Sequence, residues 1–78
     1  MTFPKALEVL KAGGPVSRIG LQNPKRVIRM VSGDGQPEKW QPYFVMETHY
    51  AKGIEREPYM LRTSDILADD WVDLRDRL

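Results

Sequence analysis

The sequence predicts an α+β domain, with an N-terminal helix packed on a small antiparallel sheet and a short helix before the last strand. The chain opens with apolar residues at helical spacing, and its middle alternates with a period of two. A run near its end changes from helical to strand-like spacing. Because 78 residues leave room for only one core, we expect a single domain over residues 1–78.

Composition narrows the class of protein. The chain has no cysteine, so disulfides and thiolate metal sites are excluded, as is typical of proteins in a reducing cytoplasm. A net charge of +1 argues against a general nucleic-acid binder. No apolar run approaches the roughly 20 residues that cross a bilayer. We therefore expect a soluble, cytoplasmic protein with neither a nucleic-acid nor a membrane partner.

The first element is an amphipathic helix. Thr2 is a plausible N-cap, Pro4 is tolerated in the first turn, and Gly13 with Gly14 supplies the C-terminal stop. The apolar face has the spacing i, i+3, i+4, i+7 and consists of Phe3, Ala6, Leu7 and Leu10.

Three strands are expected in the middle of the chain. Val16–Ile19 predicts a short strand that ends at Gly20. Arg26–Val31 and Pro42–Tyr50 alternate between two faces and predict an antiparallel hairpin joined by a long loop over residues 32–41. We expect Ala51–Glu57 to form a charged turn, after which Pro58–Leu61 adds another strand.

The run from Thr63 to Leu74 predicts a short helix that leads into the last strand. Thr63 or Ser64 can cap this helix, and Asp65 lies where a carboxylate meets the positive end of the helix dipole. Period-two spacing begins at Trp71. The residue types predict that Leu67, Trp71 and Leu74 are core anchors.

No catalytic or metal-binding pattern is visible in the sequence. His49 is the only histidine, and a zinc site would need further nitrogen or sulfur ligands. No nucleophile motif surrounds any serine. We therefore expect a structural or surface role for His49, no metal, no cofactor and no enzymatic activity.

Three segments carry a resemblance to a known family. Asp-Ile-Leu-Ala-Asp-Asp-Trp, ending at Trp71, resembles the Asp-Leu-Leu-Ala-(acidic)-Asp-Trp signature near the C-terminus of the Thoeris anti-defence 2 family. The first 13 residues resemble the N-terminal helix of this family, and Pro42–Thr48 resembles its central strand. The three matches lie in family order and span nearly the full length.

The resemblance implies a small phage or prophage protein that binds a signal without degrading it. Members of the family sequester cyclic nucleotide immune signals, chiefly glycocyclic ADP-ribose made by Thoeris systems, and some also take up cyclic dinucleotides. The implied state is a homo-oligomer, most often a tetramer built as a dimer of dimers, in the cytoplasm of an infected or lysogenic host. The alternatives are a small phage structural or regulatory interaction module and, with little support, a hydrolase of the signal.

The ligand is expected where the Gly20–Asn23 turn meets the Tyr59–Asp65 segment of the same or a neighbouring subunit. Relatives usually carry a tryptophan where Leu21 stands, so this chain offers an apolar contact without an aromatic ring. Gln22 and Asn23 provide amide groups for a base edge or a ribose. The alternative for these residues is a plain turn.

The second half of the expected site combines a ring, charges and a helix start. Tyr59 could stack on a base, and Arg18 or Arg62 could neutralise a diphosphate. Asp65 could accept hydrogen bonds from ribose hydroxyls or a base amine. The helix N-terminus, formed by Thr63 and Ser64, would offer N–H groups to a phosphate. Equally, Tyr59 could be a packed strand residue and Arg62 a solvated one.

Overall fold

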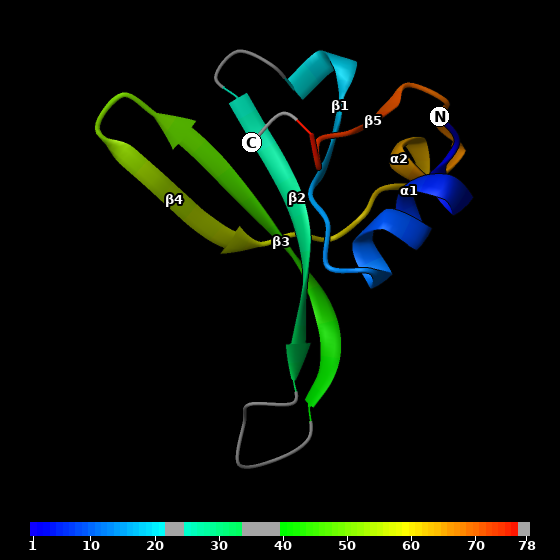
Figure 1. Cartoon of the computed structure of the whole chain (residues 1–78), viewed down its shortest axis with the longest axis horizontal. Coiled ribbons are helices and arrows are strands. Elements are labelled where there is room, and N and C mark those ends of the chain that lie inside the picture. Colours follow the sequence, from blue (N-terminus) through cyan, green and yellow to red (C-terminus); the bar gives the residue numbers. More distant parts are fainter. Residues whose placement is uncertain (22–24, 34–39, 77–78) are drawn as a thin grey trace.

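The computed structural model describes residues 1–21, 25–33 and 40–76, apart from the side chains of residues 32, 33, 40 and 41. Two α-helices, a short 3-10 helix and a five-stranded sheet make up this part of the chain (Figure 1). In chain order the elements are α1 (Phe3–Lys11), β1 (Val16–Arg18), the short 3-10 helix η1 (Ile19–Leu21), β2 (Lys25–Gly33), β3 (Trp40–Tyr50), β4 (Gly53–Pro58), α2 (Thr63–Leu67) and β5 (Trp71–Asp73).

The sheet is antiparallel throughout and has the strand order β4-β3-β2-β1-β5. Strands β2 and β3 form its long central hairpin, in which Ile28 lies opposite Met46. The last strand, β5, pairs with β1 and places Trp71 opposite Arg18. The predicted α+β fold, with an N-terminal helix on an antiparallel sheet and a short helix before the last strand, is confirmed.

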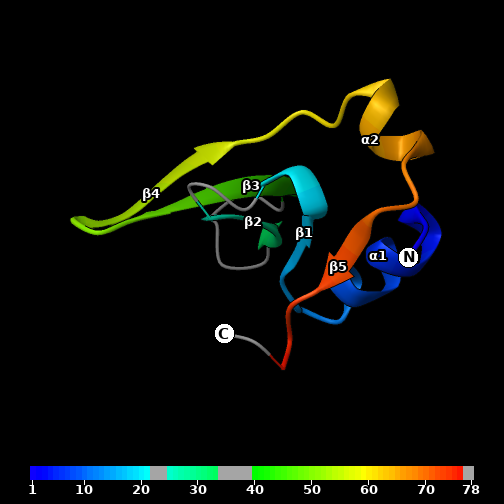
Figure 2. The same ribbon diagram turned by 90° about the horizontal axis from the view of Figure 1, so that it is seen from above.

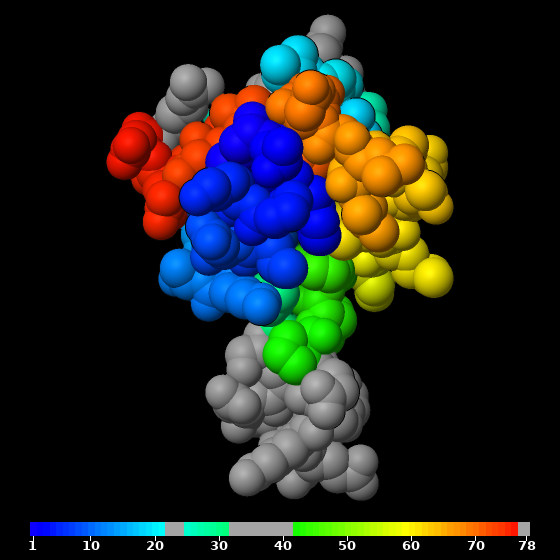
Figure 3. Space-filling model, turned by 90° about the vertical axis from the view of Figure 1, so that its right-hand side faces the viewer, coloured from blue at the N-terminus to red at the C-terminus, as the bar shows by residue number. Residues whose placement is uncertain are grey.

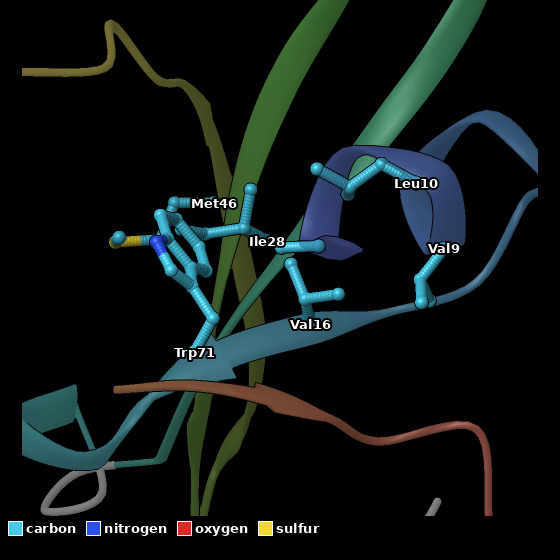
Figure 4. Close-up of a cluster of buried hydrophobic side chains, with 7 residues drawn as sticks. Val9, Leu10, Val16, Ile28, Met46 and Trp71 are labelled. Carbon is cyan, nitrogen blue, oxygen red and sulfur yellow. The ribbon is translucent and has the colours of Figure 1, made fainter. Parts of the chain in front are cut away.

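The core lies between α1 and one face of the sheet. Ala6, Val9 and Leu10 of α1 pack against residues of β1, β2, β3 and β5. Figure 4 shows the indole of Trp71 among these apolar side chains, and Trp71 is only 2% exposed. The contacting sheet residues are Val16, Ile28, Met46 and Trp71.

Helix α1 ends as the glycine pair predicts. Gly13 has a φ of 88°, a left-handed conformation that glycine adopts without a steric penalty. The Gly13 N–H donates to the Leu10 carbonyl at 3.0 Å, and the Gly14 N–H donates to the Val9 carbonyl at 2.9 Å. These two bonds form a Schellman motif, which satisfies carbonyls that the helix end would otherwise leave free. Thr2 occupies the N-cap position, although its side chain makes no capping hydrogen bond.

The prediction of a charged turn over Ala51–Glu57 followed by a strand over Pro58–Leu61 was wrong. The turn is confined to residues 51–52, and the strand is β4, which begins at Gly53 and ends at Pro58. Every residue of β4 is exposed, since the strand lies at the edge of the sheet. Such a strand needs no apolar face, and charged side chains are common on sheet edges. Its sequence therefore lacks the alternation that marks a half-buried strand.

Two details of the α2 region also differ from prediction. The N-cap is Arg62, not Thr63 or Ser64, because the chain enters its helical turn one residue earlier. Leu67 is 78% exposed and does not anchor the core, whereas Trp71 and Leu74 do, at 2% and 3% exposure. In the part of the chain that the structure describes, no helix is long and apolar enough to span a membrane.

Candidate functional site

The carboxylate of Asp65 is the centre of a polar cluster at one end of the molecule. Asp65 is only 3% exposed. Its Oδ1 accepts a hydrogen bond from Arg18 Nη1 at 2.7 Å. Its Oδ2 accepts one from the Tyr59 hydroxyl at 2.7 Å and one from the Arg62 backbone N–H at 2.9 Å. Three donors, one from β1 and two from the segment before α2, thus satisfy one buried charge.

Local structure brings these groups together. Asp65 is the third residue of α2, so its side chain can reach back to the N–H of the N-cap residue, as in one half of a capping box. Tyr59 lies in the segment between β4 and α2, where its N–H donates to the Phe44 carbonyl of β3 at 2.9 Å. Arg18 ends β1. The cluster therefore ties the sheet to α2.

Arg18 makes a second ion pair beside a ring. Its Nε donates to Asp70 Oδ1 at 2.8 Å. The guanidinium carbon lies 6.0 Å from the centroid of the Trp71 ring, within the range of a cation–π interaction. The Trp71 indole N–H in turn donates to the Asp65 carbonyl at 2.9 Å. The polar cluster and the apolar core consequently share Trp71.

The environment keeps the cluster charged. Burial alone would raise the pKa of Asp65, but hydrogen bonds from the Arg62 N–H, Tyr59 and Arg18 outweigh it and hold that pKa below its ordinary value. Burial and the hydrogen bond to Asp65 raise the pKa of Tyr59. The hydrogen bond from Arg18 lowers the pKa of Asp70. At neutral pH the cluster therefore contains one guanidinium, two carboxylates and a neutral phenol.

The structure brings several of the predicted site residues together. Arg18, Tyr59 and Asp65 bond to one another, and Arg62 joins them through its backbone N–H. The side chains of Arg62, Thr63 and Ser64 are exposed at the start of α2. Leu21 is partly buried against the core, and Gln22 and Asn23 lie outside the described residues. The predicted site is therefore centred on an internally bonded cluster with an exposed rim.

Asp65 is well suited to positioning other groups. A carboxylate offers about four acceptor positions, and three are taken by donors of this chain. The predicted contact of Asp65 with ribose hydroxyls or a base amine stays a prediction. Arg18 is partly exposed, and the side chains at the start of α2 are exposed. The Tyr59 ring is partly buried and packs against the hydrophobic core.

Sequence reasoning missed two members of the cluster. Asp70 was read as part of a family signature without a bonding partner, and Trp71 only as a core anchor. The signal for both was the start of the last strand, since Trp71 begins β5 opposite Arg18 and Asp70 directly precedes it. Figure 3 shows the face of the molecule on which α1 lies between the β5 end of the chain and the α2 segment.

Among residues 1–21, 25–33 and 40–76, no three acidic or histidine side chains group as metal ligands.

No curated protein matches this chain significantly. A family model described as the Thoeris anti-defense 2-like domain matches residues 1–74, which is nearly the whole chain. This match supports a role of the protein in anti-defence against Thoeris. With this extent of match, the chain belongs to the Thoeris anti-defense 2-like domain family.

Proposed function

We propose that this protein binds and sequesters a cyclic nucleotide immune signal, chiefly glycocyclic ADP-ribose, without degrading it. Cyclic dinucleotides are further candidate ligands. Sequestration in the cytoplasm of an infected or lysogenic host would keep the signal from the effector that responds to it. Tight binding is sufficient for this role, and it requires no catalytic group.

The observation that carries the proposal is the Asp65-centred cluster. A cyclic ADP-ribose combines a diphosphate, ribose hydroxyls and a purine, so its binding site needs a cation, hydrogen-bonding groups and an aromatic or apolar surface. The cluster holds the Arg18 guanidinium and the Tyr59 ring in fixed positions beside the exposed side chains of Arg62, Thr63 and Ser64. Such preorganisation reduces the entropy lost on binding.

We further propose that a neighbouring subunit completes this site in a homo-oligomer, most readily a dimer of dimers. Large apolar side chains near the cluster support this step, because water-exposed groups of this kind are often covered in assemblies. They are Ile19, Met60, Ile66 and Leu67, at 66%, 88%, 48% and 78% exposure. A chain of 78 residues also has a small core, for which oligomerisation is a common remedy.

Isothermal titration against a panel of cyclic ADP-ribose isomers and cyclic dinucleotides tests the proposal. We expect one member to bind far more tightly than linear ADP-ribose, and to be recovered chemically unchanged after the protein is heat-denatured. Recovery of a cleaved product would indicate an enzyme. Absence of binding across the whole panel would remove the proposal.

The same exposed apolar residues also favour a second candidate, a protein–protein interaction module. Sedimentation with and without the best ligand separates the two. A module would bind no member of the panel, and its assembly state would be independent of the added nucleotides. A signal-sequestering protein would form an oligomer at micromolar concentration, and this oligomer would bind ligand in a fixed ratio to its subunits.

A further inference from the structure

A hollow of about 580 Å³ lies on β2, β3 and β4. Figure 2 shows β4 and the adjoining part of β3 extending away from α1 and α2. None of the residues predicted as the nucleotide site lines this hollow. A volume of this size falls in the range of small-molecule sites.

Strand register places polar and apolar groups in adjacent rows of the hollow. Arg29, Val45 and Pro58 lie opposite one another in the first row. Glu47 and Arg56 are paired in the row on one side. Val31 and Tyr43 are paired in the row on the other side. The hollow thus has a charged end and an apolar end with an aromatic ring.

Glu47 holds the two arginines at the charged end. It is only 3% exposed, and its carboxylate accepts from Arg29 Nε at 2.9 Å and from Arg56 Nε at 2.8 Å. Burial alone would raise the pKa of Glu47, but the two arginines outweigh it and keep the carboxyl ionised. Each arginine is fixed through Nε, and its Nη nitrogens make no hydrogen bond within the part of the chain that the structure describes. Among the described residues, the Nη nitrogens of both arginines are therefore held in fixed orientations and are available to a ligand.

The charges of the hollow favour a singly charged ligand. Arg29 and Arg56 contribute two positive charges, and Glu47 and Glu57, which also borders the hollow, contribute two negative charges. Because these charges sum to zero, a second negative charge on the ligand would gain no net attraction, and a monoanion can already pair with the Nη groups of the two arginines. Carboxylates match the planar fork of arginine through two parallel hydrogen bonds.

We propose that this hollow binds a carboxylate carried on a flat ring. The carboxylate bonds to the Nη groups of Arg29 and Arg56, and the ring lies on Tyr43, Val45 and Pro58. The site is separate from the nucleotide site proposed above and does not depend on it.

Benzoate is the probe that tests the proposal, by two-dimensional NMR titration of the ¹⁵N-labelled protein. We expect saturable shifts of the Val45 and Tyr43 amides and of the Arg29 and Arg56 Nε–H signals. Acetate lacks the ring and benzyl alcohol lacks the charge, so the affinity of each should be lower than that of benzoate by about tenfold or more. Phenyl phosphate carries the ring with more charge and should not bind more tightly than benzoate. Equal affinity for acetate or benzyl alcohol, or tighter binding of phenyl phosphate, would overturn the assignment.

Variants locate the site. Arg29→Gln and Arg56→Gln should each weaken benzoate binding about tenfold, because each removes a charge-assisted hydrogen bond. Arg29→Lys keeps a cation beside Glu47 but loses the planar fork, and it should weaken binding in a protein whose spectrum shows the parent fold. Arg75→Gln is the matched control, since Arg75 is exposed, pairs with Asp73 and does not line the hollow. If Arg75→Gln weakens binding as much as the other variants, only general charge attraction is present and the site does not exist.

Discussion

Arg18 Nη1 lies 2.7 Å from Asp65 Oδ1, although the two residues are 47 positions apart in the chain. The side chains are 24% and 5% exposed, so the pair is largely removed from water. An ion pair in such a place is stable only when the remaining donors and acceptors are also satisfied. Here Tyr59 and the Arg62 N–H complete the bonding of Asp65, and Asp70 bonds to Arg18. The five residues form one hydrogen-bonded network.

Asp65→Ala should lower the free energy of unfolding by about 3–5 kcal/mol, because it leaves Arg18 and the Tyr59 hydroxyl without their shared acceptor. Urea denaturation followed by tryptophan fluorescence measures the change. Asp69→Ala is the control, since Asp69 is exposed and should change the free energy by less than about 0.5 kcal/mol. A loss of under about 1 kcal/mol in Asp65→Ala would show that the cluster contributes little to stability.

Trp71→Ala should cost about 3–5 kcal/mol of stability, as large-to-small changes of buried aromatic residues usually do. Trp71 is 2% exposed, packs with Phe3 at a ring distance of 5.5 Å and donates to the Asp65 carbonyl. Trp71→Phe keeps much of the packing and loses the indole donor, so its cost should be clearly smaller. Equal costs for the two variants would mean that the hydrogen bond, and not the packing, dominates.

Gly13→Ala should destabilise the protein by about 1–2 kcal/mol, because alanine is strained in the left-handed conformation that ends α1. A Cβ at Gly13 would meet no atom within 4 Å, so strain and not crowding is the cause. Gly20→Ala is the matched control, since Gly20 has equally open space and no positive φ. Thermal unfolding followed by circular dichroism should separate the two variants by several degrees.

Stability should fall as the pH is lowered below about 4.5. The pKa values of Asp65 and Glu47 in the folded protein lie below their ordinary values of 3.8 and 4.5. The unfolded chain therefore binds more protons in this range, and the stabilisation is complete above the ordinary values and lost as the pH falls through the folded ones. Asp65→Asn and Glu47→Gln should each flatten the dependence of unfolding free energy on pH between about 5 and 2. A parent curve that is flat in this range would contradict the prediction.

Periodicity revealed those elements that have one buried face. Helix α1 shows its apolar stripe, and the β2–β3 hairpin shows its alternation, since Ile28 and Met46 face the helix. Strand β4 could not be found in this way, because an exposed edge strand has no apolar face. The N-cap was misplaced because Asp65 reaches back to the N–H of Arg62, a bond whose register the residue types alone do not fix.

The sequence predicted some members of the Asp65-centred cluster but not the bonds between them. The family signature contains Asp65, the aromatic ring pointed to Tyr59, and charge pointed to Arg18. Nothing in the sequence indicates that all three bond to one another, because their contact depends on the pairing of β1 with β5 and on the path from β4 to α2. The arginine pair on Glu47 was missed for a similar reason, since it depends on the register of three strands.

Tyr59 provides the sharpest test of the proposed ligand site. Tyr59→Ala removes the ring and should weaken binding of the best ligand in the panel about tenfold or more, as the loss of one stacking partner usually does. Tyr59→Phe keeps the ring and loses only the hydrogen bond to Asp65, so it should bind more tightly than Tyr59→Ala. Isothermal titration of both folded variants measures these differences, and affinities equal to that of the parent would exclude this site.

Substitutions at Leu21 test whether this protein binds a different ligand from its relatives. Leu21, the last residue of η1, is partly buried against the core. The family resemblance implies a tryptophan at this position in relatives. Leu21→Trp would add an aromatic face at this position, and a purine stacked on it should bind about tenfold more tightly. The titration uses the same panel as for the parent, with Leu21→Met as a control that keeps an apolar side chain of similar volume and adds no ring. If Leu21→Trp gains affinity for a cyclic ADP-ribose and Leu21→Met does not, the turn contacts the base, whereas equal affinities in all three proteins would place the ligand elsewhere.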